Sequence, residues 1–247
     1  MLRYFIKLSY KGTPFNGWQI QPNASTVQGE IEDALSKILR TQVGITGCGR
    51  TDSGVHASEF FAHFDAENPI DKAQVQFKLN CILPREIAIH DIYEVPLELH
   101  ARFSAVSRTY HYYINQEKSA FRFQESWFMH SRLNIEEMNK ACEVLLGRHD
   151  FTSFSKLHTQ TKTNFCTITE AFWEKEGNGL KFTVTADRFL HNMVRAIVGT
   201  TVEVGKGKLN VEGFKNVIEA QNRQKAGASV PAEGLFLARI IYPEIKA

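Results

Sequence analysis

The chain has 247 residues, of which 43% are hydrophobic and 23% charged, with a formal net charge of +2 at pH 7. This balance excludes intrinsically disordered and fibrous proteins, and the length suffices for one large domain or two of modest size. No run approaches the ~18 consecutive apolar residues that a membrane-spanning helix requires.

The first half of the chain predicts a mixed pattern of strands and helices. RYFIKLSY (3–10) alternates apolar and polar residues as a strand does, and STVQGEIEDALSKILR (25–40) has helical spacing with a capping box of Ser25 and Gln28. The remaining elements expected are strands near 42–46 and 59–64, a helix over 71–82, and a strand over 87–95. The order is therefore β-α-β-β-α-β.

The second half repeats this order without repeating the sequence. SRTYHYYIN (107–115) is a predicted strand, and NIEEMNKACEVLLG predicts a helix with Asn134 as N-cap and Gly147 as its stop. TITEAFWEK and LKFTVTA are expected to pair across EGNG as a hairpin. Two helical stretches, HNMVRAIVGTTVEV and VEGFKNVIEA, precede a closing strand, LFLARIIY.

Two such halves predict an α+β fold of ferredoxin-like or RRM-like units. We expect their strands to form one extended, mostly antiparallel sheet with helices on one face and the other face open. The boundary falls near Ala101–Val106, which predicts an N-terminal half of residues 1–103 and a C-terminal half of residues 104–247.

Charge and cysteine usage indicate the kind of binding partner and the cellular compartment. Residues 1–103 carry a net charge of −2 and residues 104–247 a net charge of +4, so a polyanion is expected to favour the second half. The four cysteines (Cys48, Cys81, Cys142 and Cys166) form no C-x-x-C pair, which favours free thiols over a structural metal site. The N-terminus is strand-like and lacks the features of a signal peptide, so we expect a cytoplasmic protein. From the cysteine spacing we expect no metal.

One loop, GCGRTDSGVHA (47–57), concentrates three glycines with Cys48, Arg50, Asp52 and His56. Glycines permit positive φ and close approach of the backbone to a ligand. The loop matches neither of the two glycine-rich phosphate-binding motifs, G-x-x-x-x-G-K-[ST] and G-x-G-x-x-G. A histidine bonded to the backbone and a small packed thiol are the commoner explanations of His56 and Cys48 than a general base and a nucleophile.

The loop closely resembles the signature of the A family of tRNA pseudouridine synthases, whose catalytic residue would here be Asp52. Further segments resemble that family in the same order: YKGTPFNGWQIQPNASTVQGEIEDAL, ARFSAVSRTYHYYI, RFLHNMVRAIVGT and PAEGLFLARIIY. The sequence departs from the family at Thr109, where many relatives carry a basic residue, and over Phe154–Ile168, a segment that we expect to face RNA.

The resemblance implies roles for particular residues around a central catalytic cleft. Asp52 would be the nucleophile, Tyr110 would pack on the target uracil, and Arg195 would pair with Asp52 and keep it ionised. Arg50 would fill the space vacated by the flipped base or contact RNA. On spacing alone, Arg195 also fits an exposed helix arginine, and Tyr110 fits a core aromatic on the same face as Tyr112.

The resemblance also implies an isomerase that needs no cofactor, since the reaction involves no redox change and no group donor. The implied substrate is the anticodon arm of tRNA at positions 38, 39 and 40, and the implied assembly is a homodimer. Two other functions stay open: a non-catalytic RNA-binding module, and a hydrolase of glycosides or nucleosides. The hydrolase requires a second carboxylate near the first, and Glu59 is the nearest in the sequence to the loop.

Overall fold

The computed structural model describes residues 1–156, 163–243 and 245. It divides into two compact units, one of Met1–Val106 with Phe236–Ala247 and the other of Ser107–Leu235. The prediction kept residues 104–247 together, whereas the structure groups the last strand with the first unit. The reason is its parallel pairing with a strand of that unit, at Phe236↔His56 and Leu237↔Ala57.

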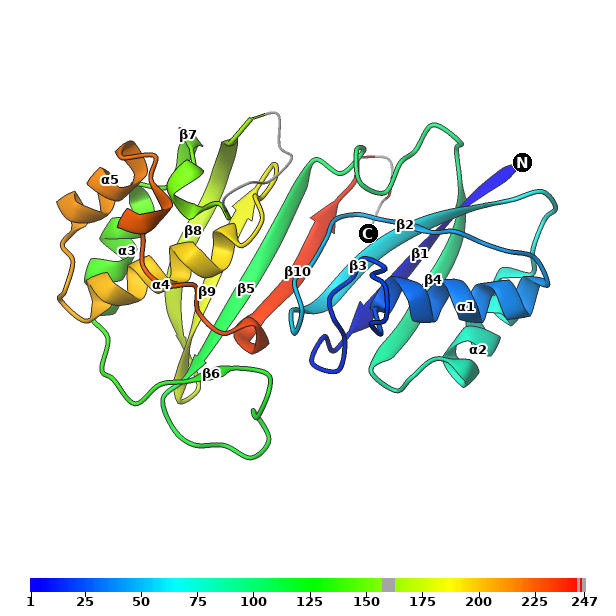
Figure 1. Cartoon of the computed structure of the whole chain (residues 1–247), viewed down its shortest axis with the longest axis horizontal. Coiled ribbons are helices and arrows are strands. Elements are labelled where there is room, and N and C mark those ends of the chain that lie inside the picture. Colours follow the sequence, from blue (N-terminus) through cyan, green and yellow to red (C-terminus); the bar gives the residue numbers. More distant parts are fainter. Residues whose placement is uncertain (157–162, 244, 246–247) are drawn as a thin grey trace. The chain divides into compact units, whose positions relative to one another are not determined.

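The first unit has a sheet of order β4-β1-β3-β10, with β2 paired to β3. Its elements are β1 (Leu2–Tyr10), α1 (Val27–Leu39), β2 (Thr46–Gly47), β3 (His56–Ala66), α2 (Lys72–Ile82), β4 (Ile87–Val95) and β10 (Leu235–Ile241). Figure 1 shows α1 and α2 on the same face of this sheet. The predicted β-α-β-β-α-β order is confirmed for the first half, although β2 is shorter than the predicted strand at 42–46.

The start of α1 differs from the predicted capping box. Thr26 is the N-cap, and its Oγ1 accepts a hydrogen bond from the Gly29 N–H at 3.3 Å. The side chain of Gln28 instead accepts from the backbone N–H of Ile20 at 3.2 Å. The N–H groups of residues 27 and 28 donate to the carbonyls of residues 17 and 18, which ties the helix start to that segment and moves the cap by one residue.

The second face of the first sheet is partly covered, although the prediction left it open. The ring of Tyr242 makes edge contacts with Phe5 and Phe61 at centroid distances of 5.5 and 5.2 Å. On the same face, Lys7 forms an ion pair with Glu59 at 2.9 Å. The C-terminal segment thus covers two aromatic rings of β1 and β3, on the face of the sheet that the helices do not cover.

The second unit has a sheet of order β5-β9-β8-β7, with β6 paired to β5. Its elements are β5 (Ser107–Asn115), β6 (Trp127–Phe128), α3 (Ile135–Glu143), β7 (Gly147–Asp150), a 3-10 turn (Thr152–Phe154), β8 (Phe165–Glu176), β9 (Gly179–Ala186), α4 (Met193–Gly205), α5 (Val211–Glu219) and two further 3-10 turns (Arg223–Lys225 and Ala232–Gly234). Its helices lie on one face of the sheet (Figure 1). Tyr112, Phe182 and Trp173 pair side by side across β5, β9 and β8 and are buried.

The sequence predicts most of the second unit. The hairpin between β8 and β9 closes at Glu176↔Gly179, as expected from EGNG. The predicted helix stop at Gly147 is wrong, because α3 ends at Glu143 and Gly147 begins β7 with φ +94°. Across the described residues, five helices and ten mostly antiparallel strands confirm the predicted α+β class.

Candidate active site

The glycine-rich loop joins β2 to β3 in the first unit, as predicted. The Cys48 N–H donates to the carbonyl of Phe61 at 2.8 Å, which continues the pairing of β2 with β3 into the loop. Gly54 has φ +79°, a conformation that favours glycine, and the Val55 N–H donates to the Asp52 carbonyl at 3.1 Å. A tight turn therefore surrounds Asp52, whose side chain is half-buried.

Hydrogen bonds hold this turn on both sides of Asp52. Before it, the Thr51 hydroxyl lies 2.9 Å from the hydroxyl of Tyr10 at the end of β1. After it, the Ser53 hydroxyl donates to the carbonyl of Phe15 at 3.2 Å. Both partners come from residues 10–19, which we call the clamp segment.

Gly17 allows the clamp segment to approach the loop closely. It has φ +84°, and a Cβ at this position would lie 2.5 Å from the carbonyl oxygen of Thr51. The next residue, Trp18, donates its backbone N–H to the same carbonyl at 3.3 Å. The peptide bond just before Asp52 is thus held by direct backbone contact, which permits no side chain between the two segments.

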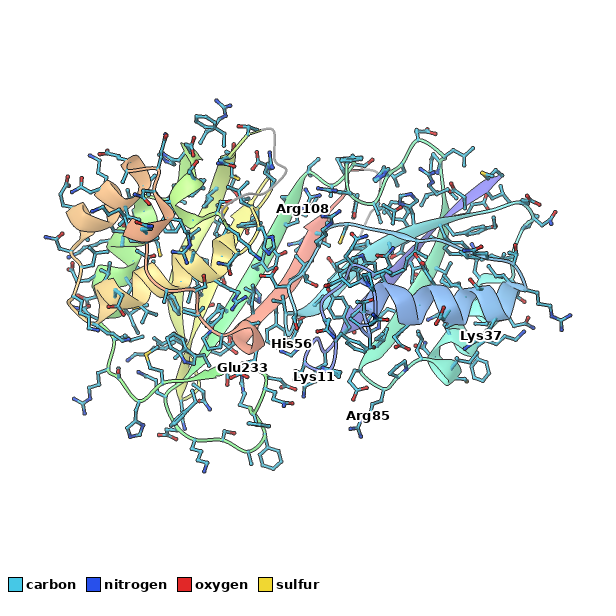
Figure 2. All side chains as sticks on the ribbon, in the orientation of Figure 1. Lys11, Lys37, His56, Arg85, Arg108 and Glu233 are labelled. Atoms are coloured by element: carbon cyan, nitrogen blue, oxygen red, sulfur yellow. The ribbon has the colours of Figure 1, made fainter. Side chains whose placement is uncertain are left out.

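His56 and Cys48 are both buried and packed within the first unit. His56 is only 1% exposed at the start of β3 (Figure 2), where its Nδ1 accepts the Gly12 N–H at 3.1 Å and its ring stacks on Phe236 at 4.4 Å. Cys48 is a buried thiol, 2% exposed. These positions agree with a backbone-bonded histidine and a packed thiol.

Arg50 lies two residues before Asp52 and is exposed. Its Nε donates to the side-chain oxygen of Gln19 at 2.9 Å, which fixes the direction of an otherwise flexible guanidinium. The sequence did not single out Gln19 as a site residue, although it belongs to the G-W-Q segment noted for its resemblance.

Tyr110 lies in the second unit on β5, paired with Val184 of β9. Its ring is half-exposed and meets the ring of Phe189 edge-on at 5.1 Å. Tyr112, by contrast, is fully buried and donates its hydroxyl to the carbonyl of Pro231 at 2.9 Å. Burial raises the pKa of Tyr112 well above its usual range. Tyr112 is the core aromatic of this strand, and Tyr110 is not.

Arg195 is the third residue of α4 and is half-buried. Its Nε donates to the carbonyl of Val230 at 2.7 Å, and the Val230 N–H returns a bond to the Arg195 carbonyl at 3.3 Å. These contacts exclude the alternative of an exposed helix arginine, and they orient the guanidinium at its inner nitrogen. The Val230 segment is itself fastened to the start of α4 by a bond between Asn192 and Ser229.

The four predicted site residues are thus divided between the units: Asp52 and Arg50 in the first, Tyr110 and Arg195 in the second. Together they comprise one carboxylate, two guanidiniums and an aromatic face, which are groups suited to a nucleophile and to recognition of a base and its phosphates. Residues 157–162 of the predicted RNA-facing segment lie outside the described residues. In the described part of that segment, Phe165 has an exposed ring, and the guanidinium of Arg148 lies 4.7 Å above it.

The chain is similar to known proteins along nearly its whole length. A family model described as tRNA pseudouridine synthase matches residues 8–104 and 141–243. The chain is 56% identical to a tRNA pseudouridine synthase A of Parabacteroides distasonis, over 99% of this chain and 97% of the relative. It is 52% identical to one of Bacteroides thetaiotaomicron (99% and 92% covered) and 37% identical to one of Caldicellulosiruptor bescii (98% and 100% covered). In the described part of the chain, none of the helices is long and apolar enough to cross a membrane.

Proposed function

This chain belongs to the tRNA pseudouridine synthase family, whose members are isomerases, and we propose that it converts uridines of the anticodon arm to pseudouridine at positions 38, 39 and 40 with Asp52 as the nucleophile. The observation that carries the proposal is the clamped turn that presents one carboxylate. In net terms the N1–C1′ bond breaks, a C5–C1′ bond forms, and the proton on C5 is replaced by one on N1.

Asp52 acts in this proposal by covalent catalysis. Attack by a carboxylate forms an intermediate with the substrate and divides one difficult step into two easier ones. Attack at C6 of the base and attack at C1′ of the ribose are both open to a carboxylate. The bonds to Thr51 and Ser53 serve this role because they hold the backbone on both sides of the reacting group.

The other predicted residues act on the base and on the charge of Asp52. We assign Tyr110 to stacking on the target uracil, which is supported by its half-exposed ring on β5. Arg50 is assigned to the flipped-out nucleotide or its phosphate, and Gln19 to holding Arg50 in place. Arg195 is assigned to stabilising the ionised form of Asp52, which a water-poor pocket would otherwise disfavour.

A hydrolase is the less favourable function for this site. Glycosidases use two carboxylates about 5–9.5 Å apart. Glu59 does not serve as the second, because one of its oxygens pairs with Lys7 at 2.9 Å and the other accepts the Ile240 N–H at 2.9 Å. A non-catalytic RNA-binding module would need neither Asp52 nor Arg195, and the chain has both.

Mapping of modified positions tests the proposal directly. The protein is incubated with unmodified tRNA, and pseudouridine is located by its chemical adduct and reverse transcription. We expect new pseudouridine at positions 38, 39 or 40 and no free uracil. Release of uracil would favour the hydrolase, and modification elsewhere in the tRNA would overturn the choice of the anticodon arm.

We also propose a homodimer that acts in the cytoplasm. The dimer is what the family resemblance implies, and the match of the relatives over the whole chain supports that resemblance. Cys81, Cys142 and Cys166 carry free thiols, which favours a reducing compartment. Sedimentation equilibrium measures the assembly, and a monomer at micromolar concentration would contradict it.

A further inference from the structure

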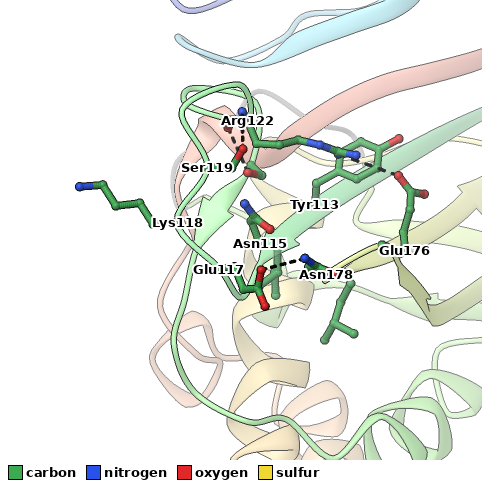
Figure 3. A pocket seen from close by; sticks show the side chains of 13 residues that line it. Tyr113, Asn115, Glu117, Lys118, Ser119, Arg122, Glu176 and Asn178 are labelled. Atoms are coloured by element: carbon green, nitrogen blue, oxygen red, sulfur yellow. Dashed lines mark hydrogen bonds and ion pairs between the residues drawn. The ribbon is translucent and has the colours of Figure 1, made fainter.

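A pocket of about 440 Å³ lies in the second unit, and neither Tyr110 nor Arg195 lines it. It is lined by the end of β5, the β8–β9 hairpin and the connection of residues 116–126, which we call the exposed loop (Figure 3). Asn115 lines it at the end of β5, five residues beyond Tyr110, which corresponds to ~17 Å along a strand. The pocket is therefore not the place where Tyr110 would stack on the target base.

The lining of the pocket is suited to a polar ligand. Asn115 contributes an amide that has no hydrogen bond to another described residue, so its donors and acceptor are available. Asn178 donates its amide to Glu117 at 2.7 Å, which fixes the orientation of a second amide in the pocket. Paired amide donors and acceptors match the edges of nucleobases.

Two cations at the pocket, Arg122 and Lys118, are suited to contact a phosphate. Glu176 is held by Lys181 at 3.4 Å and faces Arg122 at 4.0 Å, and Glu117 is occupied by its bond with Asn178. A distance of 4.0 Å leaves the donors of Arg122 available for a closer acceptor. Figure 3 shows Lys118 pointing outward from the rim, where a neighbouring phosphate would lie.

Two phenylalanines flank Arg122 in the chain and are exposed to solvent. Phe121 is 95% exposed and Phe123 is 70% exposed. Exposed aromatic rings beside cations are a common feature of surfaces that bind unpaired nucleotides, because each base can stack on a ring while its phosphate pairs with a cation.

We infer that the exposed loop and the pocket form a second tRNA site, which binds an unpaired nucleotide other than the target uridine. The inference rests on the proposed tRNA substrate. Phe121 and Phe123 supply stacking, Asn115 contacts the edge of the base, and Arg122 and Lys118 contact phosphates. The site adds affinity and leaves the chemical step unchanged, because none of these residues contacts the reacting uridine.

The test compares the parent with Phe121→Ala/Phe123→Ala, Asn115→Ala and Arg122→Gln. Filter binding gives the Kd for full-length unmodified tRNA, and single-turnover assays at saturating tRNA give the rate of pseudouridine formation. We expect the double variant to bind about ten-fold more weakly, and the other two about three- to ten-fold, with unchanged rates at saturation. Chemical probing of bound tRNA should reveal one unpaired nucleotide, outside positions 38–40, that the parent protects and the double variant exposes.

Phe77→Ala is the matched control, because Phe77 is also 70% exposed but lies on α2 in the first unit. It should bind tRNA as the parent does. Equal affinity of the parent and the double variant would overturn the inference, as would equal weakening by Phe77→Ala. An altered sedimentation state of the double variant with unchanged tRNA affinity would also overturn it, by assigning the loop to a protein contact. Weaker binding by the variants without pseudouridine formation by the parent would keep the site and reject the proposed function.

Discussion

The segments of residues 47–57 and 116–126 are both eleven residues long and rich in polar groups, yet their surroundings differ. In the first, Thr51 and Ser53 are hydrogen-bonded to the clamp segment and Gly17 lies against its backbone. In the second, Phe121 and Phe123 extend into solvent. The first loop has little freedom to move, and the second presents rings that can adapt to a ligand.

The difference follows from what each loop is proposed to do. A nucleophile loses much of its rate when it moves by about 1 Å, so a carboxylate needs a backbone that is fixed on both sides. Stacking on a base tolerates changes of position because every base presents a flat face. The chain thus places its fixed contacts at Asp52 and its exposed aromatic surface at Phe121 and Phe123.

The largest effect is expected from Asp52→Asn, which keeps the shape of the clamped loop and removes its nucleophile. Pseudouridine formation should fall by about 10³-fold or more, while tRNA affinity and the unfolding midpoint stay close to those of the parent. Single-turnover assays and filter binding measure both. Residual activity within about ten-fold of the parent would reject Asp52 as a covalent catalyst.

The clamp positions Asp52, but a different group is proposed to keep it ionised. Arg195→Met should reduce the rate at neutral pH by about 10²-fold and by less at higher pH, because the guanidinium is proposed to favour the ionised form of the nucleophile. Arg195→Lys should be intermediate, since lysine keeps the charge but not the planar fork. Single-turnover rates across pH provide the measurement. An equal loss at every pH, caused by weaker tRNA binding, would make Arg195 a phosphate contact instead.

Gly17→Ala tests whether the clamp itself matters. The new Cβ would meet the Thr51 carbonyl at 2.5 Å, in a backbone conformation with φ +84° that alanine disfavours. We expect a loss of about 2–3 kcal/mol in the free energy of unfolding and about ten-fold in rate. Gly44→Ala is the control, because a Cβ there meets no atom within 4 Å. Similar stability of the two variants would show that the clamp segment can move aside.

Gln19→Ala probes a side-chain contact between the clamp segment and Arg50. Without the 2.9 Å bond, the guanidinium samples more rotamers, so tRNA binding or base flipping should weaken about two- to five-fold. Gln19→Glu retains an acceptor, so its tRNA binding and rate should be close to those of the parent. An unchanged Kd and rate for Gln19→Ala would show that Arg50 needs no support.

A final effect, on stability and not on activity, concerns β3, the strand that follows the clamped loop. His63 is buried on this strand, and its Nδ1 accepts the Ala101 N–H at 3.2 Å. Burial, helped by Arg3 and His100 and opposed by Asp65, lowers the pKa of His63 from 6.5 to about 4. The neutral form is therefore the native one, and its contribution to stability is complete above pH 6.5 and is lost as the pH falls toward 4.

We expect the unfolding free energy to be about 1–2 kcal/mol lower at pH 5 than at pH 7 because of this histidine. His63→Asn, which keeps an acceptor but does not titrate, should flatten the dependence. Part of the slope should persist, since His100 also has a lowered pKa through burial. Chemical denaturation across pH measures this slope of the unfolding free energy. An identical slope in the variant would exclude His63 as its source.

Elements with clear periodicity were predictable from the sequence. SRTYHYYIN gives the bounds of β5, and the alternation of IAIHDIYEV gives those of β4. The two-residue strands β2 and β6 show no such alternation, because their pairing depends on neighbours distant in the sequence. The cap of α1 was displaced for the same reason, since bonds to residues 17 and 18 determine where that helix begins.

The sequence offers candidates for the chemistry of the site but not for the contacts that hold them. Asp52 lies in a distinctive loop, and Tyr110 and Arg195 lie in segments whose likeness to a family is visible in one sequence. The contacts that hold these residues involve backbone atoms, such as the Val230 carbonyl that orients Arg195. Any residue type offers a carbonyl, so the sequence contains no signal for that partner.

The place of β10 in the chain has a consequence for synthesis on the ribosome. The first unit is completed only by Phe236 and the residues after it, and the whole second unit of roughly 130 residues is translated in between. At ~5–20 residues per second this interval lasts on the order of 6–26 s, and the first unit stays incomplete for that time. During that time β3 lacks its partner at His56 and Ala57, and Tyr242 does not yet cover Phe5 and Phe61. A chain truncated before residue 236 is therefore expected to keep an unpaired edge on β3, the kind of surface that chaperones bind.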